Sequence, residues 1–121
     1  MQRAAAVYVR VSSQQQVDNF SLGVQEQACR DYCHRQGWEV ARVFREEGES
    51  AKTVDRTQLN ALLDYCREHK QIIAAVVVHS LSRWSRETYD HFALTHVLRN
   101  LGIKLRSATE AIDDTASGEL M

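Results

Sequence analysis

Short apolar runs alternate with longer amphipathic segments along this chain. The apolar runs cover residues 4–11, 38–44, 72–78 and 103–107, and each has the length of a β-strand. In the runs at 4–11 and 72–78 apolar residues follow one another instead of alternating with polar ones, which is typical of strands buried on both faces of a sheet. The run at 72–78, with the sequence IIAAVVV, is the strongest signal of this kind. The pattern therefore predicts a buried sheet.

The segments between these runs have the spacing of amphipathic helices. Their apolar stripes consist of Val24, Ala28 and Tyr32, of Leu59, Leu62, Leu63 and Cys66, and of Phe92, Ala93, His96, Val97 and Leu101. Ser21 is a favourable cap for the first helix, and Gly37 and Gly102 stand where a left-handed residue often ends a helix. The order β-α-β-α-β-α-β, with right-handed crossovers, predicts a three-layer α/β fold with a central, mostly parallel sheet of four to five strands flanked by helices.

The composition is that of one ordinary globular domain. The chain has 121 residues, of which 44% are hydrophobic and 26% are charged. Because the formal net charge is −1, affinity for DNA or for an anionic membrane must come from a local basic cluster. No apolar run approaches the roughly 20 residues of a membrane-spanning helix. Three cysteines without a signal peptide favour reduced thiols and a cytoplasmic location.

Arginine and serine residues follow the carboxyl ends of the predicted strands. Arg10 and Ser12 end the first strand, Arg56 follows the polar loop after the second, and Arg83 and Arg86 come after the third. Ligands of parallel α/β sheets bind outside the carboxyl ends of the strands, so we expect these side chains to meet at one site. Guanidinium groups suit a phosphate, and a serine hydroxyl beside them is a candidate nucleophile.

Each of these residues also has an ordinary structural explanation. A serine after a strand is most often a turn or capping residue, and the arginines after the third strand could form solvated ion pairs with Glu87. Glu110, Asp113 and Asp114 could bind magnesium, although an acidic loop is more often simply solvated. The alternative functions are therefore a metal-dependent nuclease or phosphatase of similar architecture and a protein-interaction fragment without catalysis.

Five segments together resemble a known family. They read YVRVSSQQQ at residues 8–16, SLGVQEQ at 21–27, EEGESAKTVDR at 46–56, VVVHSLSRWSRE at 76–87 and SATEAIDDTASGELM at 107–121. In this order they are similar to the amino-terminal catalytic domain of the serine recombinases, the resolvase/invertase family. The spacing between Ser12 and Gln25 and the form SLGVQ look more like the large serine recombinases, which include phage integrases and transposon-borne enzymes, than the small resolvases.

The resemblance implies site-specific DNA recombination through a covalent 5′-phosphoserine, without a metal or nucleotide cofactor. Ser12 would be the nucleophile that attacks the scissile phosphodiester. The residues that would hold the phosphate oxygens are Arg10, Arg56, Arg83 and Arg86, and those that would line the site are Gln16, Gln25 and Ser50. The implied partners are double-stranded DNA and further copies of the protein, as a dimer and a synaptic tetramer. The implied location is the bacterial cytoplasm, with the gene carried by the bacterium, by a phage or by another mobile element.

Two features depart from the family pattern. Ser82 stands where an aspartate commonly precedes the first arginine after the third strand, so the general acid and base are not assigned. The chain also ends before the long helix that the family uses for dimer contacts and further active-site groups, and it lacks a DNA-binding domain. Residues 1–121 are therefore expected to form a catalytic domain that folds, is largely monomeric and does not cleave DNA by itself.

Overall fold

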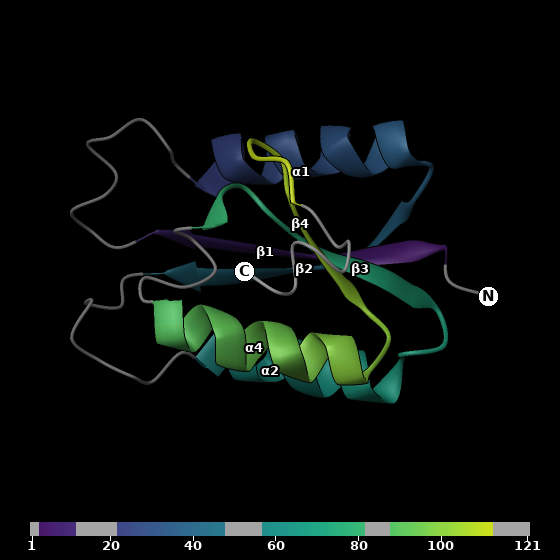
Figure 1. The fold of residues 1–121 in the computed structure, drawn as a ribbon. Helices are drawn as coiled ribbons and strands as arrows, with labels where there is room; N and C mark the ends of the chain where they lie inside the picture. The colour runs from purple at the N-terminus through teal and green to yellow at the C-terminus, as the bar shows by residue number, and fades with distance from the viewer. Residues whose placement is uncertain (1–2, 12–21, 48–56, 82–87, 113–121) are drawn as a thin grey trace.

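A computed structural model of the chain describes residues 3–11, 22–47, 57–81 and 88–112 (Figure 1). The helices and strands in these ranges follow the predicted order. They are β1 (Ala4–Val11), α1 (Leu22–Gln36), β2 (Glu39–Glu47), α2 (Thr57–Glu68), β3 (Ile73–Val78), α4 (Thr88–Asn100) and β4 (Lys104–Ser107). None of the helices in the described part of the chain is long and apolar enough to cross a membrane.

The four strands form one parallel sheet in the order β2-β1-β3-β4. Strand β1 therefore lies in the interior of the sheet, and it pairs with β2 from Ala4 opposite Glu39 to Val11 opposite Glu47. Helix α1 covers one face of the sheet, and α2 and α4 lie together on the other face (Figure 1). The predicted three-layer α/β fold with a parallel central sheet is confirmed.

Strand β1 is buried on both faces, as its continuous apolar sequence predicts. Tyr8 packs in one cluster with Leu62 of α2 and Leu98 of α4. Val7 packs in the cluster on the other face, with Cys29 of α1. All of these side chains are fully buried, and each large apolar one contributes roughly 1.5–3 kcal/mol relative to an exposed position. The core therefore holds the central strand in place up to the point where its polar end begins.

Helix α4 buries a stripe that shares only Val97 and Leu101 with the predicted one. The residues that pack against the core are Leu94, Val97, Leu98 and Leu101, at the spacing i, i+3, i+4, i+7. Phe92 is 61% exposed, and Ala93 and His96 are exposed as well, so the prediction that they face the core is wrong. The helix sequence carries two overlapping apolar stripes, and the one with large residues at every contact position faces the sheet.

Three strands begin one residue after their predicted starts at Trp38, Ile72 and Ile103. The N–H groups at these positions close the preceding helix or turn instead. The bonds run from Trp38 N to Cys33 O at 2.9 Å, from Ile72 N to His69 O at 2.9 Å and from Ile103 N to Leu98 O at 3.0 Å. Strand β2 also continues beyond its predicted end at residue 44 to residue 47, because its polar end pairs with the end of β1.

Gly37 and Gly102 end the turns after α1 and α4, as predicted. Their φ angles are 79° and 76°, in the left-handed region that glycine enters without a steric penalty. Gly37 N donates to His34 O at 3.1 Å and Gly102 N to Arg99 O at 2.9 Å. These bonds satisfy helix carbonyl groups and turn the chain directly into the next strand.

The cysteines Cys29, Cys33 and Cys66 are free and buried. Burial raises the pKa of Cys29 to about 12, that of Cys33 to about 11 and that of Cys66 to about 12. The thiolate is the reactive form of cysteine, so these side chains behave as small apolar core residues at neutral pH.

Candidate active site

The carboxyl ends of the strands lie at one edge of the sheet, which we call the carboxyl edge (Figure 1). Tyr8 of β1 is level with Val78 of β3, and Val78 is level with Ser107 of β4. On the other side of β1, Arg10 is level with Glu46 of β2. The segments that follow neighbouring strands therefore start side by side at this edge, which is where open α/β sheets bind ligands.

Of the predicted site residues, Arg10 and Gln25 are described by the structure. The others lie outside the described residues; they are Ser12, Gln16, Ser50, Arg56, Arg83 and Arg86. Their described neighbours along the chain include Val11 at the end of β1, Thr57 at the start of α2, and Leu81, three residues beyond the end of β3. The structure thus shows how the chain is anchored on either side of the predicted site segments.

Gln25 joins helix α1 to the end of β1. Its side chain is fully buried, its Nε2 donates to the carbonyl oxygen of Arg10 at 2.9 Å, and its Oε1 accepts from the N–H of Arg10 at 3.2 Å. A buried amide needs partners at both ends, and here both partners belong to one residue of the strand. Since Arg10 lies two residues before Ser12, this contact sets the strand end from which Ser12 follows.

The sequence pattern does not indicate this contact. Val24, which is predicted to lie on the apolar stripe of α1, is 49% exposed. The residues of α1 that are buried are Gln25, Cys29 and Cys33. A glutamine inside the stripe conceals its period, and its burial is tolerated because the amide is hydrogen-bonded. The resemblance assigns Gln25 to the lining of the site; the structure shows it bonded to the main chain of Arg10, and a contact with DNA stays a prediction.

Glu46 anchors the first turn of α2 at the end of β2. It is 2% exposed, and its carboxylate accepts from the N–H groups of Gln58 at 3.2 Å and Leu59 at 3.1 Å. The other donors to this carboxylate are the hydroxyl groups of Tyr8, at 3.2 Å, and Thr57, at 3.5 Å. A carboxylate here accepts hydrogen bonds from N–H groups that a helix start leaves without partners. Its negative charge is also stabilised by the positive end of the helix dipole. Because α2 begins directly after Arg56, Glu46 anchors the chain next to that arginine.

Sequence reasoning missed this role of Glu46. The local capping signals are a serine, threonine, aspartate or asparagine at the helix start and a glutamate three residues later. Glu46 instead acts on residues 12 and 13 positions further along the chain. The sequence offers one signal for this role, an acidic residue at the end of a partly apolar strand. That signal points to a helix cap only once the strand register is known.

The end of β3 is held by the residues that follow β4. The N–H of Ala108 donates to the carbonyl oxygen of Val78 at 2.8 Å. The hydroxyl of Thr109 donates to the carbonyl oxygen of His79 at 2.9 Å, and the Oγ of Ser107, which is 2% exposed, lies 3.1 Å from the same oxygen. The third strand end of this edge is therefore also fixed by a neighbouring element.

Glu26 connects α1 to β2 beside this edge. It accepts hydrogen bonds from Arg30 Nε at 2.8 Å and from Arg45 Nε at 3.0 Å. Partial burial by itself would raise the pKa of Glu26, but the hydrogen bonds and charges of the two arginines outweigh it and hold the pKa below its ordinary value. These two arginines are therefore paired with a carboxylate, so they add little positive field at the carboxyl edge.

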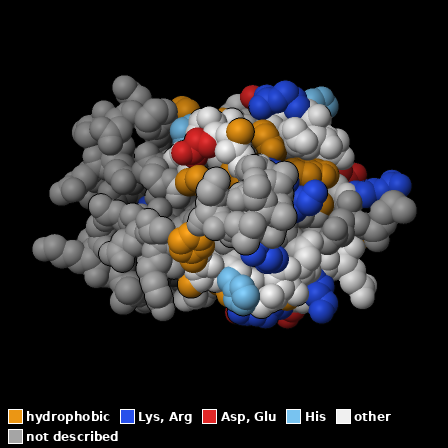
Figure 2. Space-filling view, in the orientation of Figure 1, with side chains coloured by type: hydrophobic (Ala, Val, Ile, Leu, Met, Phe, Trp, Pro, Cys, Tyr) orange, Lys and Arg blue, Asp and Glu red, His pale blue; other side chains and the backbone are white. Residues whose placement is uncertain are grey.

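The described surface does not gather its basic side chains in one area of the view. Figure 2 shows the lysine and arginine side chains of the described residues distributed singly or in small groups over this face. This distribution agrees with the net charge of −1. On this face the described residues therefore offer no concentrated basic patch for a phosphate.

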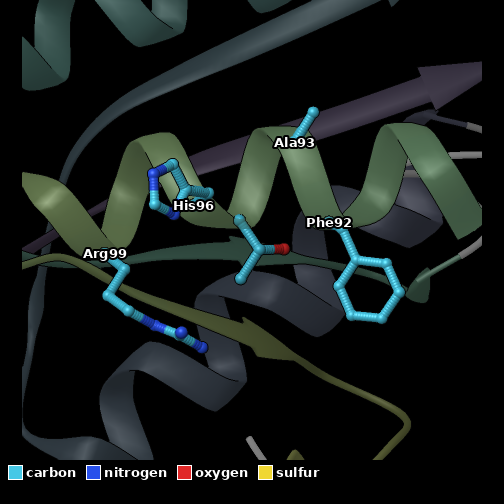
Figure 3. Close-up of a pocket in the computed structure, with 5 residues that line it drawn as sticks. Phe92, Ala93, His96 and Arg99 are labelled. Carbon is cyan, nitrogen blue, oxygen red and sulfur yellow. The ribbon is translucent and has the colours of Figure 1, made fainter.

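A separate hollow of about 390 Å³ lies along α4 (Figure 3). The described residues that line it are Phe92, Ala93, Thr95, His96 and Arg99. This lining has an imidazole and a guanidinium group but no carboxylate or thiol beside them. In the described ranges no group of three His, Cys, Asp or Glu residues is placed to hold a metal ion. The carboxyl edge is thus the stronger candidate site.

The chain matches a family model over almost its whole length. The model described as "Resolvase, N terminal domain" matches residues 5–121. A protein of Bacillus phage phi105 with the name "Uncharacterized immunity region protein 3" is 33% identical over 63 residues, which cover 51% of this chain and 77% of that protein.

Solved structures of recombinases share the fold. The N-terminal catalytic domain of TP901-1 integrase is similar with a TM-score of 0.82 and 28% identity, over 98% of this chain and 87% of that chain. A resolvase family site-specific recombinase from Streptococcus pneumoniae has a TM-score of 0.80 and 23% identity, over 95% and 78% of the two chains. The C-terminal catalytic domain of ISC1926 TnpA, an IS607-like serine recombinase, has a TM-score of 0.71 and 23% identity, over 87% and 70%.

Proposed function

The chain belongs to the resolvase family of serine recombinases, and we propose that its carboxyl edge is where Ser12 cleaves DNA. The family carries out site-specific recombination, so the domain is that of a DNA strand-exchange enzyme. The observation that carries the proposal for the site is the double hydrogen bond of Gln25 to Arg10, which holds β1 two residues before Ser12. A nucleophile must be presented in a fixed geometry to react at a useful rate.

The proposed phosphate site takes arginines from three parts of the chain. They are Arg10 at the end of β1, Arg56 before α2, and Arg83 and Arg86 after β3. The adjacency of β1 and β3 supports this grouping, as does the anchoring of the start of α2 by Glu46. Their guanidinium groups would hold the non-bridging phosphate oxygens, and Gln16 and Ser50 would complete the polar lining.

In the proposed reaction the Oγ of Ser12 forms a bond to phosphorus while the bond from phosphorus to the 3′ oxygen breaks. The serine proton passes to a general base, and the 3′ oxygen takes a proton and leaves as a hydroxyl. The 5′ phosphate stays on Ser12, and attack by the 3′ hydroxyl of another strand reverses these steps and joins the DNA. The arginines stabilise the extra negative charge of the transition state. Ser82 cannot supply the carboxylate that the family commonly has there.

The proposed partners are double-stranded DNA and further copies of the recombinase, as a dimer and a synaptic tetramer. Sequence-independent DNA affinity grows with the number of phosphates neutralised, so a domain of net charge −1 would depend on its local arginine cluster and on other parts of the assembly. Residues 1–121 would serve as the catalytic domain. Similarity to a phage protein and to an integrase supports action on a mobile element in a bacterial cytoplasm.

Substitution of Ser12 tests the proposed chemistry in the recombinase that contains this chain. Ser12→Ala should abolish the covalent protein–DNA adduct on a suicide substrate while DNA affinity stays near the wild-type value, because the removed oxygen is the attacking atom. The adduct is measured by denaturing gel electrophoresis and the affinity by gel shift. Ser13→Ala is the matched control and should keep the adduct.

Three results would contradict the proposal. An adduct formed by the Ser12→Ala variant would show that another residue is the nucleophile. Loss of cleavage on addition of a chelator would favour the metal-dependent nuclease instead, because the proposed reaction needs no metal ion. A wild-type protein that binds recombination-site DNA without ever forming an adduct would favour the non-catalytic alternative.

A further inference from the structure

The carboxylate of Glu110 reaches across the carboxyl edge to the chain that leaves β3. Its Oε1 accepts a hydrogen bond from the main-chain N–H of Leu81 at 2.6 Å, although the two residues are 29 positions apart. Leu81 is the last described residue before the segment that contains Arg83 and Arg86. Hydrogen bonds to an ionised acceptor are short and roughly twice as strong as neutral ones. Glu110 is therefore a strong contact at the entrance to that segment.

The Glu110 side chain is itself held in place by Ser107. The Oγ of Ser107 lies 3.0 Å from Glu110 Oε1 and accepts from the N–H groups of Thr109 and Glu110, each at 3.2 Å. A serine hydroxyl has one proton and two lone pairs, so it can accept from both N–H groups and share its proton between Glu110 Oε1 and the carbonyl oxygen of His79, which lies 3.1 Å away. Ser107 is 2% exposed, so its hydroxyl has a fixed position. The turn that it stabilises therefore orients the Glu110 carboxylate in the absence of substrate.

Three consecutive residues after β4 bond to the last residue of β3 and to two residues that follow it. Ala108 N bonds to Val78 O at 2.8 Å and Thr109 Oγ1 bonds to His79 O at 2.9 Å. Glu110 adds the third contact, to the N–H of Leu81. The first contact uses a main-chain donor, whereas the next two depend on side chains. The third contact is thus the one that a single substitution at residue 110 can remove while the strands stay paired.

We propose that Glu110 is a positioning residue that places the arginine segment after β3 for catalysis. Arg83 is two residues beyond Leu81, so its Cα lies within roughly 7 Å of the fixed Leu81 Cα. Fixing the N–H of Leu81 therefore limits where Arg83, the nearer of the two arginines along the chain, can meet a phosphate. This inference rests on the proposed function, because it assigns a role to a residue that supports the proposed arginines.

The burial pattern separates this role from a general contribution to folding. Glu110 is exposed and Leu81 is only partly buried, so loss of their bond removes little from the apolar core. A residue with a merely structural role at this place would leave the rate of cleavage unchanged. A positioning residue should change the rate of cleavage and leave DNA affinity and thermal stability nearly unchanged.

The test uses the recombinase that contains this chain, with saturating DNA on a suicide substrate. Glu110→Ala should lower the single-turnover rate of adduct formation roughly 10- to 100-fold, as expected for the loss of one charge-assisted hydrogen bond. Glu110→Gln keeps an acceptor oxygen and should recover most of the rate. Glu68→Ala removes an exposed acidic side chain at the far end of α2 and should behave as the wild type.

Hydrogen exchange at the Leu81 amide gives a second measurement that does not depend on activity. In this chain the amide should be protected in the wild type, less protected in Glu110→Gln and at least tenfold less protected in Glu110→Ala, whereas the Val78 amide should not change. An exchange rate of the Leu81 amide that is the same in the wild type and in both variants would overturn the proposal. So would wild-type cleavage by Glu110→Ala, or a loss of DNA affinity as large as the loss of rate.

The outcomes also distinguish this inference from the proposed function. If the wild-type protein forms no adduct, the proposed function fails and the exchange measurement still decides whether Glu110 holds Leu81. If the wild-type protein forms an adduct at Ser12 and Glu110→Ala forms it equally fast, the proposed function stands and the role of Glu110 is wrong.

Discussion

The two ends of this parallel sheet are closed in different ways. Where the strands begin, main-chain groups bond to main-chain groups: Ile72 O accepts from Arg3 N and Ala4 N at 3.1 Å each, and Glu39 N donates to Arg3 O at 3.0 Å. At the carboxyl edge there is a main-chain bond from Ala108 N to Val78 O, but most of the contacts are made by side chains of neighbouring elements that bond to the main chain. The contacts are those of Gln25 with Arg10, Glu46 with Gln58 and Leu59, Thr109 with His79, and Glu110 with Leu81.

The difference concerns which substitutions each end tolerates. Main-chain bonds are made by almost any residue, so the beginning of the sheet depends on conformation and little on side-chain identity. Side-chain bonds at the carboxyl edge exist only with the residue types now present. An edge that must hold reacting groups to within a fraction of an ångström gains precision from such contacts, and it becomes sensitive to single substitutions.

The largest effect should follow from Gln25→Ala. This change leaves the N–H and carbonyl oxygen of Arg10 without their side-chain partner, which should lower the free energy of unfolding by about 2–4 kcal/mol. Adduct formation should also fall, because the strand end before Ser12 loses its anchor. Gln27→Ala is the control, since Gln27 is exposed and bonds to Asp31 on the same helix, and it should shift stability by less than about 0.5 kcal/mol. Urea denaturation measures the free energy of unfolding, and the adduct assay measures cleavage. Equal values for Gln25→Ala and Gln27→Ala would show that the buried side-chain contact at the carboxyl edge has no special role.

Glu46→Ala should have the next largest effect. It removes two N–H contacts at the start of α2 together with a hydrogen-bond acceptor of the Tyr8 hydroxyl, which should cost about 2–3 kcal/mol of unfolding free energy. Tyr8→Phe removes one of these contacts while the helix cap stays, and it should cost about 1 kcal/mol. The two variants are compared by chemical denaturation. A larger loss in Tyr8→Phe than in Glu46→Ala would show that the cap contributes little.

The smallest effect is expected where the strands begin. Gly37→Ala and Gly102→Ala should each lower the free energy of unfolding by about 1 kcal/mol, because an alanine is strained at φ angles of 79° and 76°. A Cβ at either position would meet no atom within 4 Å, so the cost comes from the backbone alone. Adduct formation at a temperature where both variants are folded should equal that of the wild type. A clear loss of cleavage would mean that this end of the sheet also positions the reacting groups.

The elements that local physics determines were predictable from the sequence. The continuous apolar runs mark β1 and β3, which are buried on both faces, and the glycines after α1 and α4 end their helices because the left-handed conformation is a local property. The buried stripe of Leu59, Leu62, Leu63 and Cys66 on α2 is also as predicted. The convergence of strand ends follows from the parallel order, since that order requires every strand to end at the same edge.

The supporting contacts at the carboxyl edge were not predictable from local patterns. Glu46 acts 12 and 13 positions away and Glu110 acts 29 positions away, so no helical or strand period links the partners. The loop that contains Glu110 has the composition of a solvated turn or an acidic metal site. Only the strand order places it beside the end of β3. Similarly, the buried stripe of α1 contains the polar Gln25, which hides the stripe from a search for apolar spacing.

The inert thiols of the core make this protein convenient for selective labelling. Cys29, Cys33 and Cys66 are buried and protonated at neutral pH, so a maleimide should not react with them in the native protein. A cysteine introduced on the exposed surface, for example at Glu68, would then be the preferred attachment point for a fluorophore or spin label without prior removal of the native cysteines. When the domain opens, the same core thiols become reactive, so their rate of modification reports how often the sheet separates from its helices.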